Sequence, residues 1–166
     1  NEKKLKLYIG AGDDRIKDCM TLDIRKDVRP DVVWNLEQLP LPFKNEQFDM
    51  IFAKDVIEHI SFRKTEDLLR ELFRILTHNG KIYIQVPDLE AIAHKVIFNP
   101  NNCLGDMCGW KLISYWVYGG QDYPENIHKA GFTIVTLTKL LQQIGFQVED
   151  IKNDGGTNIQ CWAKKP

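Results

Sequence analysis

Short apolar, strand-like runs alternate with helix-like runs along most of this 166-residue chain. The strand-like runs are Lys4–Ile9, Cys19–Ile24, Asp31–Trp34, Phe48–Ala53 and Lys81–Val86. Strands joined by helical crossovers lie parallel in one sheet, because each connection has to return over a face of that sheet. The alternation therefore predicts a doubly wound, mainly parallel α/β sheet, and the length fits a single domain over residues 1–166.

The clearest helix lies between the last two of these strands. Its apolar stripe has five members at helical spacing: Leu68, Leu69, Leu72, Phe73 and Leu76. Thr65 is its predicted N-cap and Gly80 its predicted exit. A second helix, Leu137–Ile144, precedes two further strands, Phe146–Lys152 and Asn158–Lys164. Because their connection is short, these two strands should pair antiparallel and complete a seven-stranded sheet whose last strand is reversed.

The composition argues against several classes of partner. A formal net charge of −1 gives no reason to expect nucleic-acid binding. No apolar run approaches the ~18 residues that span a bilayer. The four cysteines contain no Cys-x-x-Cys pair, and no histidine stands near Cys103 and Cys108 to complete a zinc set. We therefore expect reduced thiols in a cytoplasmic protein with no metal, no membrane partner and no nucleic-acid partner.

The first strand ends in a glycine turn, Gly10-Ala11-Gly12, which lets a ligand lie against the backbone. A dinucleotide fingerprint has a third glycine where this chain has Arg15, and its acidic residue comes about 20 positions later. Here Asp23 follows Gly12 by only eleven residues, which predicts a compressed crossover between the first two strands. A carboxylate at the end of the second strand can accept hydrogen bonds from ribose hydroxyls. Nearby acidic residues would repel a pyrophosphate, so the turn favours a ligand with a ribose, an adenine and a cationic centre.

Residues from about 99 to 127 interrupt the alternation. They are rich in asparagine, glycine and aromatic residues, and Trp110–Tyr118 has the composition of an aromatic helix. An insertion after the fifth strand lies beyond the carboxyl ends of the parallel strands, where open α/β sheets bind their ligands. We expect this insertion on the substrate side of the domain.

Three short motifs follow one another between Trp34 and Ile60: Leu-Pro-Phe at 41–43, Phe-Asp at 48–49 and Glu-His at 58–59. In this order they resemble a branch of the class I S-adenosylmethionine-dependent methyltransferase family. The similarity continues through the later helices and strands and spans nearly the whole chain. It implies a Rossmann-like sheet with the third strand at one edge, the first and fourth strands adjacent and the last strand reversed. It also implies a methyltransferase whose cofactor is S-adenosylmethionine.

The resemblance implies where that cofactor would bind. The two turn glycines would flank its methionine portion, Asp23 would hold the ribose, and Asn35 would accept from the adenine amine. Arg15 would face the methionine carboxylate. The complete cofactor-binding set is Tyr8, Gly10, Ala11, Gly12, Asp23, Ile24, Asn35, Leu36, Ala53 and Lys54. Two departures from the family pattern are Tyr8, at an often acidic position, and the missing third glycine.

Two residues are candidates for accepting a proton from the methyl acceptor: His128 follows a polar loop, and Asp55 follows the fourth strand. Candidates for the acceptor pocket are Trp116, Tyr118, Asp122 and Tyr123. Structural roles are the alternatives. His128 could brace the last helix, and Asp55 could be a solvated residue at the start of a helix. The aromatic residues could belong to the core or to an interface. For His59 we favour packing or hydrogen bonding beneath the site, since helix neighbours such as Glu58 and His59 point in different directions.

The sequence thus predicts methyl transfer to a small molecule, and family analogy suggests a saccharide or related metabolite. The fourth strand ends without the Asn-Pro-Pro-Tyr-like motif of DNA amino-methylating enzymes. The alternative is a non-catalytic module that binds S-adenosylmethionine or S-adenosylhomocysteine and a protein partner. A nicotinamide-dependent oxidoreductase is disfavoured by Arg15 and by the early position of Asp23. Because the chain opens almost directly on its first strand, we expect one sheet face to lack an N-terminal helical cover, which a homodimer contact could supply.

Overall fold

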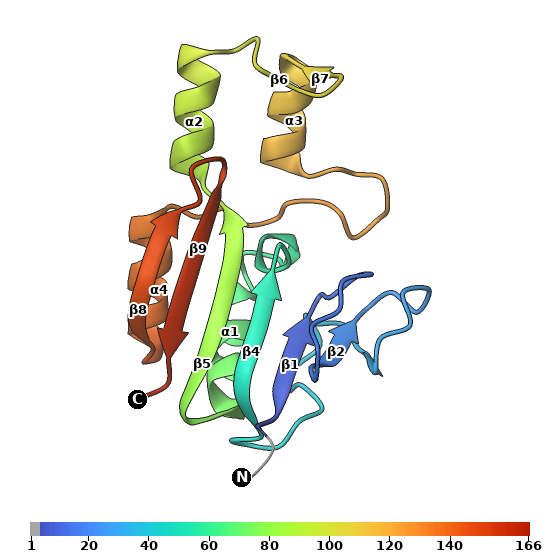
Figure 1. Cartoon of the computed structure of the whole chain (residues 1–166), viewed down its shortest axis with the longest axis vertical. Coiled ribbons are helices and arrows are strands. Elements are labelled where there is room, and N and C mark those ends of the chain that lie inside the picture. The colour runs from blue at the N-terminus through green and yellow to red at the C-terminus, as the bar shows by residue number, and fades with distance from the viewer. Residues whose placement is uncertain (1–3) are drawn as a thin grey trace.

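A computed structural model describes residues 4–166 and contains one seven-stranded sheet with helices on one face and at one end (Figure 1). The sheet order is β3-β2-β1-β4-β5-β9-β8. The strands are β1 Lys6–Ile9, β2 Met20–Asp23, β3 Val32–Val33, β4 Phe48–Lys54, β5 Leu76–Pro87, β8 Gln147–Asn153 and β9 Asn158–Lys164. Only β9 runs antiparallel to its neighbours, β5 and β8. The predicted fold class, with β3 at an edge, β1 beside β4 and a reversed last strand, is confirmed.

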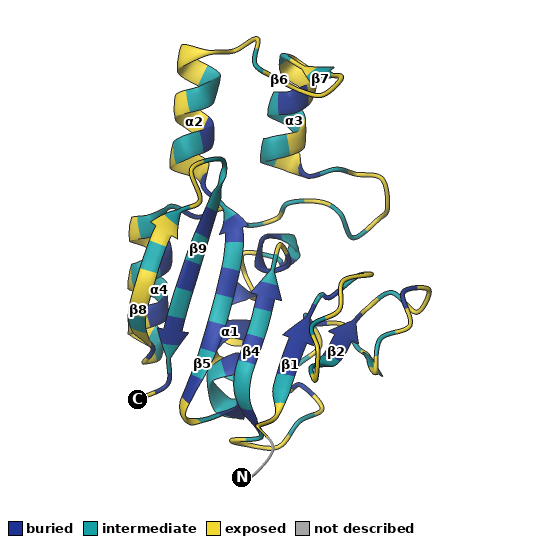
Figure 2. Ribbon diagram, viewed as in Figure 1, coloured by how far each residue is buried: buried dark blue, intermediate teal, exposed yellow. Residues whose placement is uncertain are grey.

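One face of the sheet carries the main core. Helices α1 (Thr65–Ile75) and α4 (Ile134–Ile144) lie behind the sheet in Figure 1 and contact each other. Register places Ile51, Ile82 and Ala163 side by side on three adjacent strands, and all three are fully buried. The buried positions alternate with partly exposed ones along β5 and β9 (Figure 2), as expected for a sheet covered mainly on one face.

The opposite face is lined by aromatic rings. Tyr8, Phe52, Tyr83 and Trp162 occupy one register row across β1, β4, β5 and β9. The Phe52 and Trp162 ring centroids are 6.2 Å apart, and those of Tyr83 and Trp162 are 5.0 Å apart. Turns alone join β1 to β2 and β2 to β3, so these crossovers place no helix on this face among residues 4–166.

The two short crossovers agree with the predicted compression, but the first long helix departs from its predicted limits. Its N-cap is Lys64, and Thr65 is the first helical residue, whose hydroxyl donates to the Ser61 carbonyl. β5 begins at Leu76, directly after the helix, and contains Gly80. The prediction that the helix exits at Gly80 is therefore wrong, because the chain passes from helix to strand without an intervening loop.

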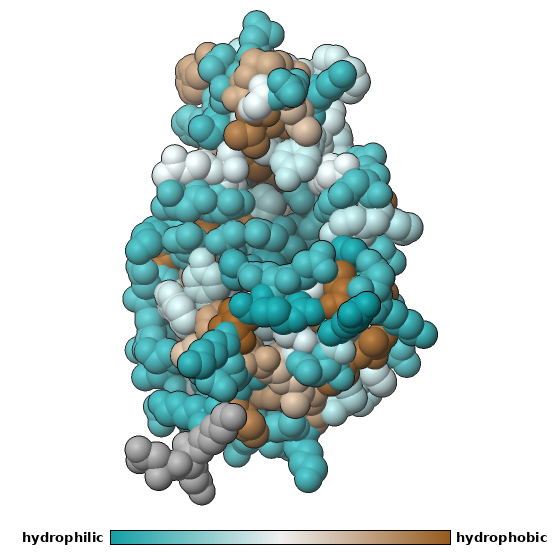
Figure 3. Space-filling view, turned by 45° about the vertical axis from the view of Figure 1, so that its right-hand side comes forward, coloured by the Kyte–Doolittle hydropathy of each residue, from teal (hydrophilic) through white to brown (hydrophobic). Residues whose placement is uncertain are grey.

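An insertion stands above the carboxyl end of β5 (Figure 1). It contains α2 (Leu89–Phe98), the two-stranded β6 (Cys103–Leu104) and β7 (Met107–Cys108), and α3 (Trp110–Tyr118). Figure 3 shows hydrophobic atoms at this end of the molecule, where the exposed side chains include those of Phe98, Leu104 and Trp110. None of the helices described in residues 4–166 has the length and apolar character needed to span a bilayer.

A disulfide joins Cys103 to Cys108 across the β6–β7 hairpin. The two residues are directly opposite in the register, and their Cα atoms are 4.1 Å apart. The prediction of reduced thiols is therefore wrong for this pair, because pairing of two short strands brings the thiols together. Cys19 and Cys161 are free thiols, as predicted.

Candidate functional site

The carboxyl ends of β1, β2, β3 and β4 surround an open cavity of about 170 Å³. Its floor is the glycine turn after β1, one wall comes from the segment after β3, and the other comes from η1 (Ile57–His59) and the loop that follows α3. Its position is the usual ligand site of an open α/β sheet. We call it the nucleoside cavity.

Both turn glycines adopt backbone conformations that favour glycine, with φ of +59° at Gly10 and +52° at Gly12. A Cβ on Gly10 would lie 2.2 Å from Cγ2 of Val56, so this glycine is also required by close packing. No atom lies within 4 Å of the corresponding position on Gly12. The Gly10 amide donates to the Leu22 carbonyl at 2.8 Å and ties the turn to β2.

Asp23 ends β2 and lines the nucleoside cavity with only 7% of its surface exposed. Its Oδ2 accepts the Gly12 amide at 2.8 Å, and its Oδ1 accepts the Arg25 amide at 2.9 Å. Each carboxylate oxygen can accept a further hydrogen bond. The two amides therefore fix the orientation of this carboxylate while leaving it able to accept from hydroxyl groups of a ligand.

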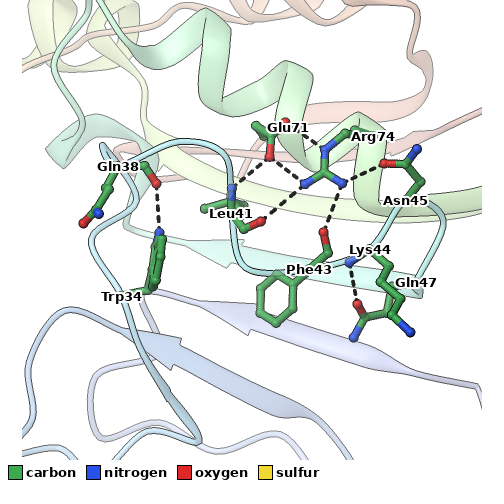
Figure 4. Close-up of polar contacts among 9 residues, drawn as sticks. All are labelled: Trp34, Gln38, Leu41, Phe43, Lys44, Asn45, Gln47, Glu71 and Arg74. Atoms are coloured by element: carbon green, nitrogen blue, oxygen red, sulfur yellow. Dashed lines mark hydrogen bonds and ion pairs between the residues drawn. The ribbon is translucent and has the colours of Figure 1, made fainter.

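Ile24, Asn35 and Leu36 also line this cavity. Asn35 Oδ1 accepts the Glu37 amide at 2.9 Å, which fixes its side chain at the entrance of the loop. Trp34 is a lining residue that the sequence analysis missed, although it directly precedes Asn35. Its Nε1 donates to the Gln38 carbonyl at 2.8 Å and holds the indole in place (Figure 4).

The Leu-Pro-Phe motif at 41–43 holds this loop against α1 (Figure 4). The Leu41 amide donates to Glu71 Oε2 at 2.9 Å, and Arg74 Nη1 donates to the Phe43 carbonyl at 3.0 Å. Glu71 and Arg74 also form two hydrogen bonds with each other, at 2.7 and 2.8 Å. The Arg74 guanidinium lowers the pKa of Glu71. The motif therefore shapes the wall of the cavity from a distance.

The other four predicted cofactor residues do not line the cavity. Tyr8, Ala11 and Ala53 are buried beside or beneath the turn. Lys54 forms an ion pair with Asp14 at 3.2 Å, and the Tyr8 hydroxyl donates to the same carboxylate at 3.0 Å.

Arg15, predicted to face the methionine carboxylate, is directed at the turn instead. Its Nη1 donates to the carbonyls of Gly12 and Asp14, and Arg15 is not among the residues that line the cavity.

A second cavity of about 390 Å³ lies under the insertion, and we call it the acceptor cavity. Trp116, Tyr123 and His128 line it, as does Asp55. Asp55, His59 and Tyr123 line both cavities, so the two spaces meet at these side chains.

Two predicted acceptor residues lie elsewhere. Tyr118 is 58% exposed, and Asp122 accepts a hydrogen bond from Asn126 Nδ2. Neither is among the residues that line the acceptor cavity.

Asp55 occupies the junction in a strained conformation, with a φ of +51°. Gln85 Nε2 donates to both of its carboxylate oxygens, at 2.9 and 3.1 Å. Asp55 is an exposed residue, yet the protein around the junction partly desolvates its carboxylate. This desolvation raises the pKa of Asp55.

Two histidines face each other in the acceptor cavity. The ring centroids of His59 and His128 are 5.0 Å apart. Burial lowers the pKa of both imidazoles and favours their neutral forms. Glu58 lies beside them with 2% of its surface exposed, and burial raises the pKa of Glu58 to about 8. The sequence analysis expected Glu58 and His59 to point apart, but Glu58 Oε1 lies 3.8 Å from His59 Nε2 and both line this cavity.

Comparisons with known proteins agree with this arrangement. Residues 15–84 match the family model described as a methyltransferase domain. A structure of an S-adenosylmethionine-dependent methyltransferase from Archaeoglobus fulgidus aligns with a TM-score of 0.65 at 15% identity and covers 99% of this chain and 87% of that one. Residues 15–84 thus match a methyltransferase domain, and the fold of the chain is similar to that of S-adenosylmethionine-dependent methyltransferases.

A second solved structure is the Burkholderia thailandensis 1,6-didemethyltoxoflavin-N1-methyltransferase with bound 1,6-didemethyltoxoflavin and S-adenosylhomocysteine. It aligns with a TM-score of 0.63 at 15% identity and covers 97% of this chain and 70% of that one. An uncharacterized protein of Methanocaldococcus jannaschii is 36% identical over 61 residues, which are 37% of this chain. The match spans about a quarter, 26%, of that relative's length.

Proposed function

We propose that this methyltransferase-family chain transfers a methyl group from S-adenosylmethionine to a small-molecule acceptor. The observation that carries the proposal is the oriented carboxylate of Asp23 beside the glycine turn, in a cavity that meets a second cavity at Asp55. A nucleoside site and an acceptor site joined at one point are what methyl transfer between two bound molecules requires.

The residues of the nucleoside cavity fit an adenosine. Asp23 offers acceptor atoms for two ribose hydroxyls, and the Gly10–Gly12 turn allows close approach of a ligand to the backbone. Ile24, Trp34 and Leu36 supply apolar surface for a base. When bound, S-adenosylmethionine supplies an electrophilic methyl group on a sulfonium.

The chain itself supplies alignment, exclusion of water and a proton acceptor. Trp116 and Tyr123 line the acceptor cavity and help to exclude water. The Arg25 guanidinium lies 4.5 Å from the centroid of the Tyr123 ring, and this contact links two residues that both line the nucleoside cavity. An alcohol acceptor must lose its proton, and both Asp55 and His128 lie in the acceptor cavity to receive it. The raised pKa of Asp55 moves this carboxylate toward the range useful for a base.

Three observations favour a small acceptor. The acceptor cavity, about 390 Å³, falls within the size range of small-molecule sites. The net charge of −1 provides no electrostatic basis for nucleic-acid binding. The similar Burkholderia protein was solved with bound 1,6-didemethyltoxoflavin. A saccharide or related metabolite remains our preferred class, and the homodimer and the cytoplasmic location stay predictions.

The function is tested by ligand preference followed by methyl transfer. Trp34 lines the nucleoside cavity, so its fluorescence should change when S-adenosylhomocysteine binds. S-adenosylhomocysteine should bind more tightly than NADH, and labelled methyl groups from S-adenosylmethionine should appear on a member of a saccharide and metabolite panel. Tighter NADH binding would contradict the cofactor, and binding without transfer to any panel member would favour the non-catalytic module.

A further inference from the structure

Three potential metal ligands converge in the acceptor cavity: a carboxylate oxygen of Glu58 and one ring nitrogen each of His59 and His128. These three atoms lie within 4.8 Å of one another. Ligand atoms around a tetrahedral ion with bonds of about 2.1 Å are roughly 3.4 Å apart. Small side-chain rotations that move the ligand atoms by about an ångström would therefore bring the three atoms to ligating distances.

One oxygen of the Glu58 carboxylate has no polar partner within the described part of the protein. This oxygen, Oε2, is buried and has no hydrogen-bond partner among residues 4–166. Burial of a carboxylate without a partner is unfavourable, and native proteins avoid it outside functional sites. A cation beside this oxygen would remove that cost.

Both histidines are oriented as metal ligands usually are. Nδ1 of His59 lies 3.1 Å from the Ile127 carbonyl, and Nδ1 of His128 lies 3.2 Å from the Trp116 carbonyl. A carbonyl can only accept, so each Nδ1 carries the proton and each neutral ring keeps its Nε2 lone pair free to coordinate.

The backbone holds the two histidine segments together. The amides of Lys129 and Ala130 both donate to the Glu58 carbonyl, at 2.7 and 3.1 Å, and the His128 amide donates to the Tyr118 carbonyl at 3.1 Å. Residues far apart in the sequence are therefore fixed before any ion arrives, which lowers the cost of assembling the site.

We infer that Glu58, His59 and His128 form a binding site for one divalent transition-metal ion of the zinc type. Two imidazoles and one carboxylate are a ligand set of catalytic zinc and of related first-row ions, whereas Mg²⁺ prefers oxygen ligands. Three protein ligands leave coordination positions toward the acceptor cavity, which all three residues line.

The site would act on the acceptor, a role that rests on the proposed methyl transfer. An ion there would hold an acceptor oxygen and lower the pKa of its hydroxyl. His128 Nε2 would then be committed to the ion, and Asp55, which lines the same cavity, would receive the hydroxyl proton. His128 would be a ligand and not the base.

The test is metal binding by the EDTA-treated, full-length protein. We expect one Zn²⁺ per chain by calorimetry, and one Co²⁺ whose visible absorption disappears when Zn²⁺ is added. Glu58→Gln and His128→Ala should each weaken Zn²⁺ binding by more than about 100-fold, because about 100-fold is the largest loss expected when only a hydrogen-bond partner of a ligand is removed. His94→Ala, which removes an exposed histidine of α2, is the matched control and should bind like the wild type.

A measurement on the wild type removes any dependence on variant folding. Zn²⁺ should shift the imidazole NMR signals of His59 and His128 and leave those of His78 and His94 unchanged. The metal site is refuted by the absence of stoichiometric Zn²⁺ binding, by unshifted His59 and His128 signals, or by equal effects of His94→Ala and His128→Ala. S-adenosylhomocysteine binding to the metal-free protein, measured in parallel, separates this failure from a failure of the proposed function.

Discussion

Replacing Gly10 with alanine tests how the cavity floor is built, and Gly12→Ala is the matched control. Both glycines have positive φ, so alanine at either position should cost about 1–2 kcal/mol of backbone strain. The two positions differ in their surroundings. A Cβ at Gly10 would lie 2.2 Å from Val56 Cγ2 and 2.6 Å from Val56 Cβ, whereas nothing lies within 4 Å at Gly12.

Overpacking of this kind typically costs about 1–3 kcal/mol. We therefore expect the free energy of unfolding to fall by about 1–2 kcal/mol for Gly12→Ala and by about 2–5 kcal/mol for Gly10→Ala. For a domain of this size, the additional loss corresponds to a melting temperature lower by roughly 2–4 °C per kcal/mol.

Urea unfolding of both variants and of a Gly10→Ala/Val56→Ala double variant measures the effect. Val56→Ala removes the nearest clashing atom but leaves the Cβ at 2.6 Å, so relief should be partial. The double variant should be more stable than the sum of the single effects by about 1 kcal/mol. Equal losses for Gly10→Ala and Gly12→Ala, or strict additivity with Val56→Ala, would refute the packing argument.

Two further substitutions test the supports of the site. Glu71→Gln should lower the free energy of unfolding by about 1–2 kcal/mol at pH 7, since a partly exposed charged hydrogen-bond network is lost. The pKa of Glu71 is lowered in the folded state, so this contribution is present above the unfolded pKa of about 4.5 and disappears as pH falls through the folded pKa. The free energies of unfolding of the wild type and Glu71→Gln, measured in urea from pH 7 to pH 3, should therefore converge. A constant difference between them would count against the ion pair. Asp88→Ala should cost about 2–4 kcal/mol, because the buried Asp88 carboxylate accepts two amides at the start of α2 and the Asn153 side chain at 2.8 Å. Thermal unfolding checks this value against Asp150→Ala on the exposed face of β8, and equal shifts would show that the cap contributes nothing.

Sequence reasoning predicted the sheet and grouped residues that the structure brings to one cavity. The early acidic residue at Asp23 indicated a compressed crossover, and the structure has only turns between β1 and β2. Gly10, Gly12 and Asp23 line one cavity because they follow neighbouring parallel strands, whose ends meet at one sheet edge.

The sequence did not predict the direction in which each side chain points. Ala53 belongs to the strand beside the site but is fully buried, because alternate residues of a strand face opposite sides. A family position identifies a place along the backbone and does not say which surface its side chain reaches.

The histidine cluster depended on tertiary structure in the same way. His59 and His128 lie 69 positions apart, and nothing in one sequence pairs them. The short 3-10 turn of η1, in place of a regular helix, brings Glu58 and His59 to one cavity. The Cys103–Cys108 disulfide likewise depends on a hairpin that no periodic pattern in the sequence predicts.

Calorimetric titration with S-adenosylhomocysteine, comparing the wild type with Asp23→Asn, Asp23→Ala and Asp67→Ala, tests the central claim most directly. Asp67 is an exposed carboxylate on α1, away from both cavities, and serves as the matched control. Losing charged hydrogen bonds of about 1.5–3 kcal/mol each should weaken binding about 10-fold for Asp23→Asn and about 100-fold or more for Asp23→Ala, with Asp67→Ala unchanged. Circular dichroism verifies that the Asp23 variants are folded. If folded Asp23 variants bind S-adenosylhomocysteine as tightly as the wild type, the result contradicts the account.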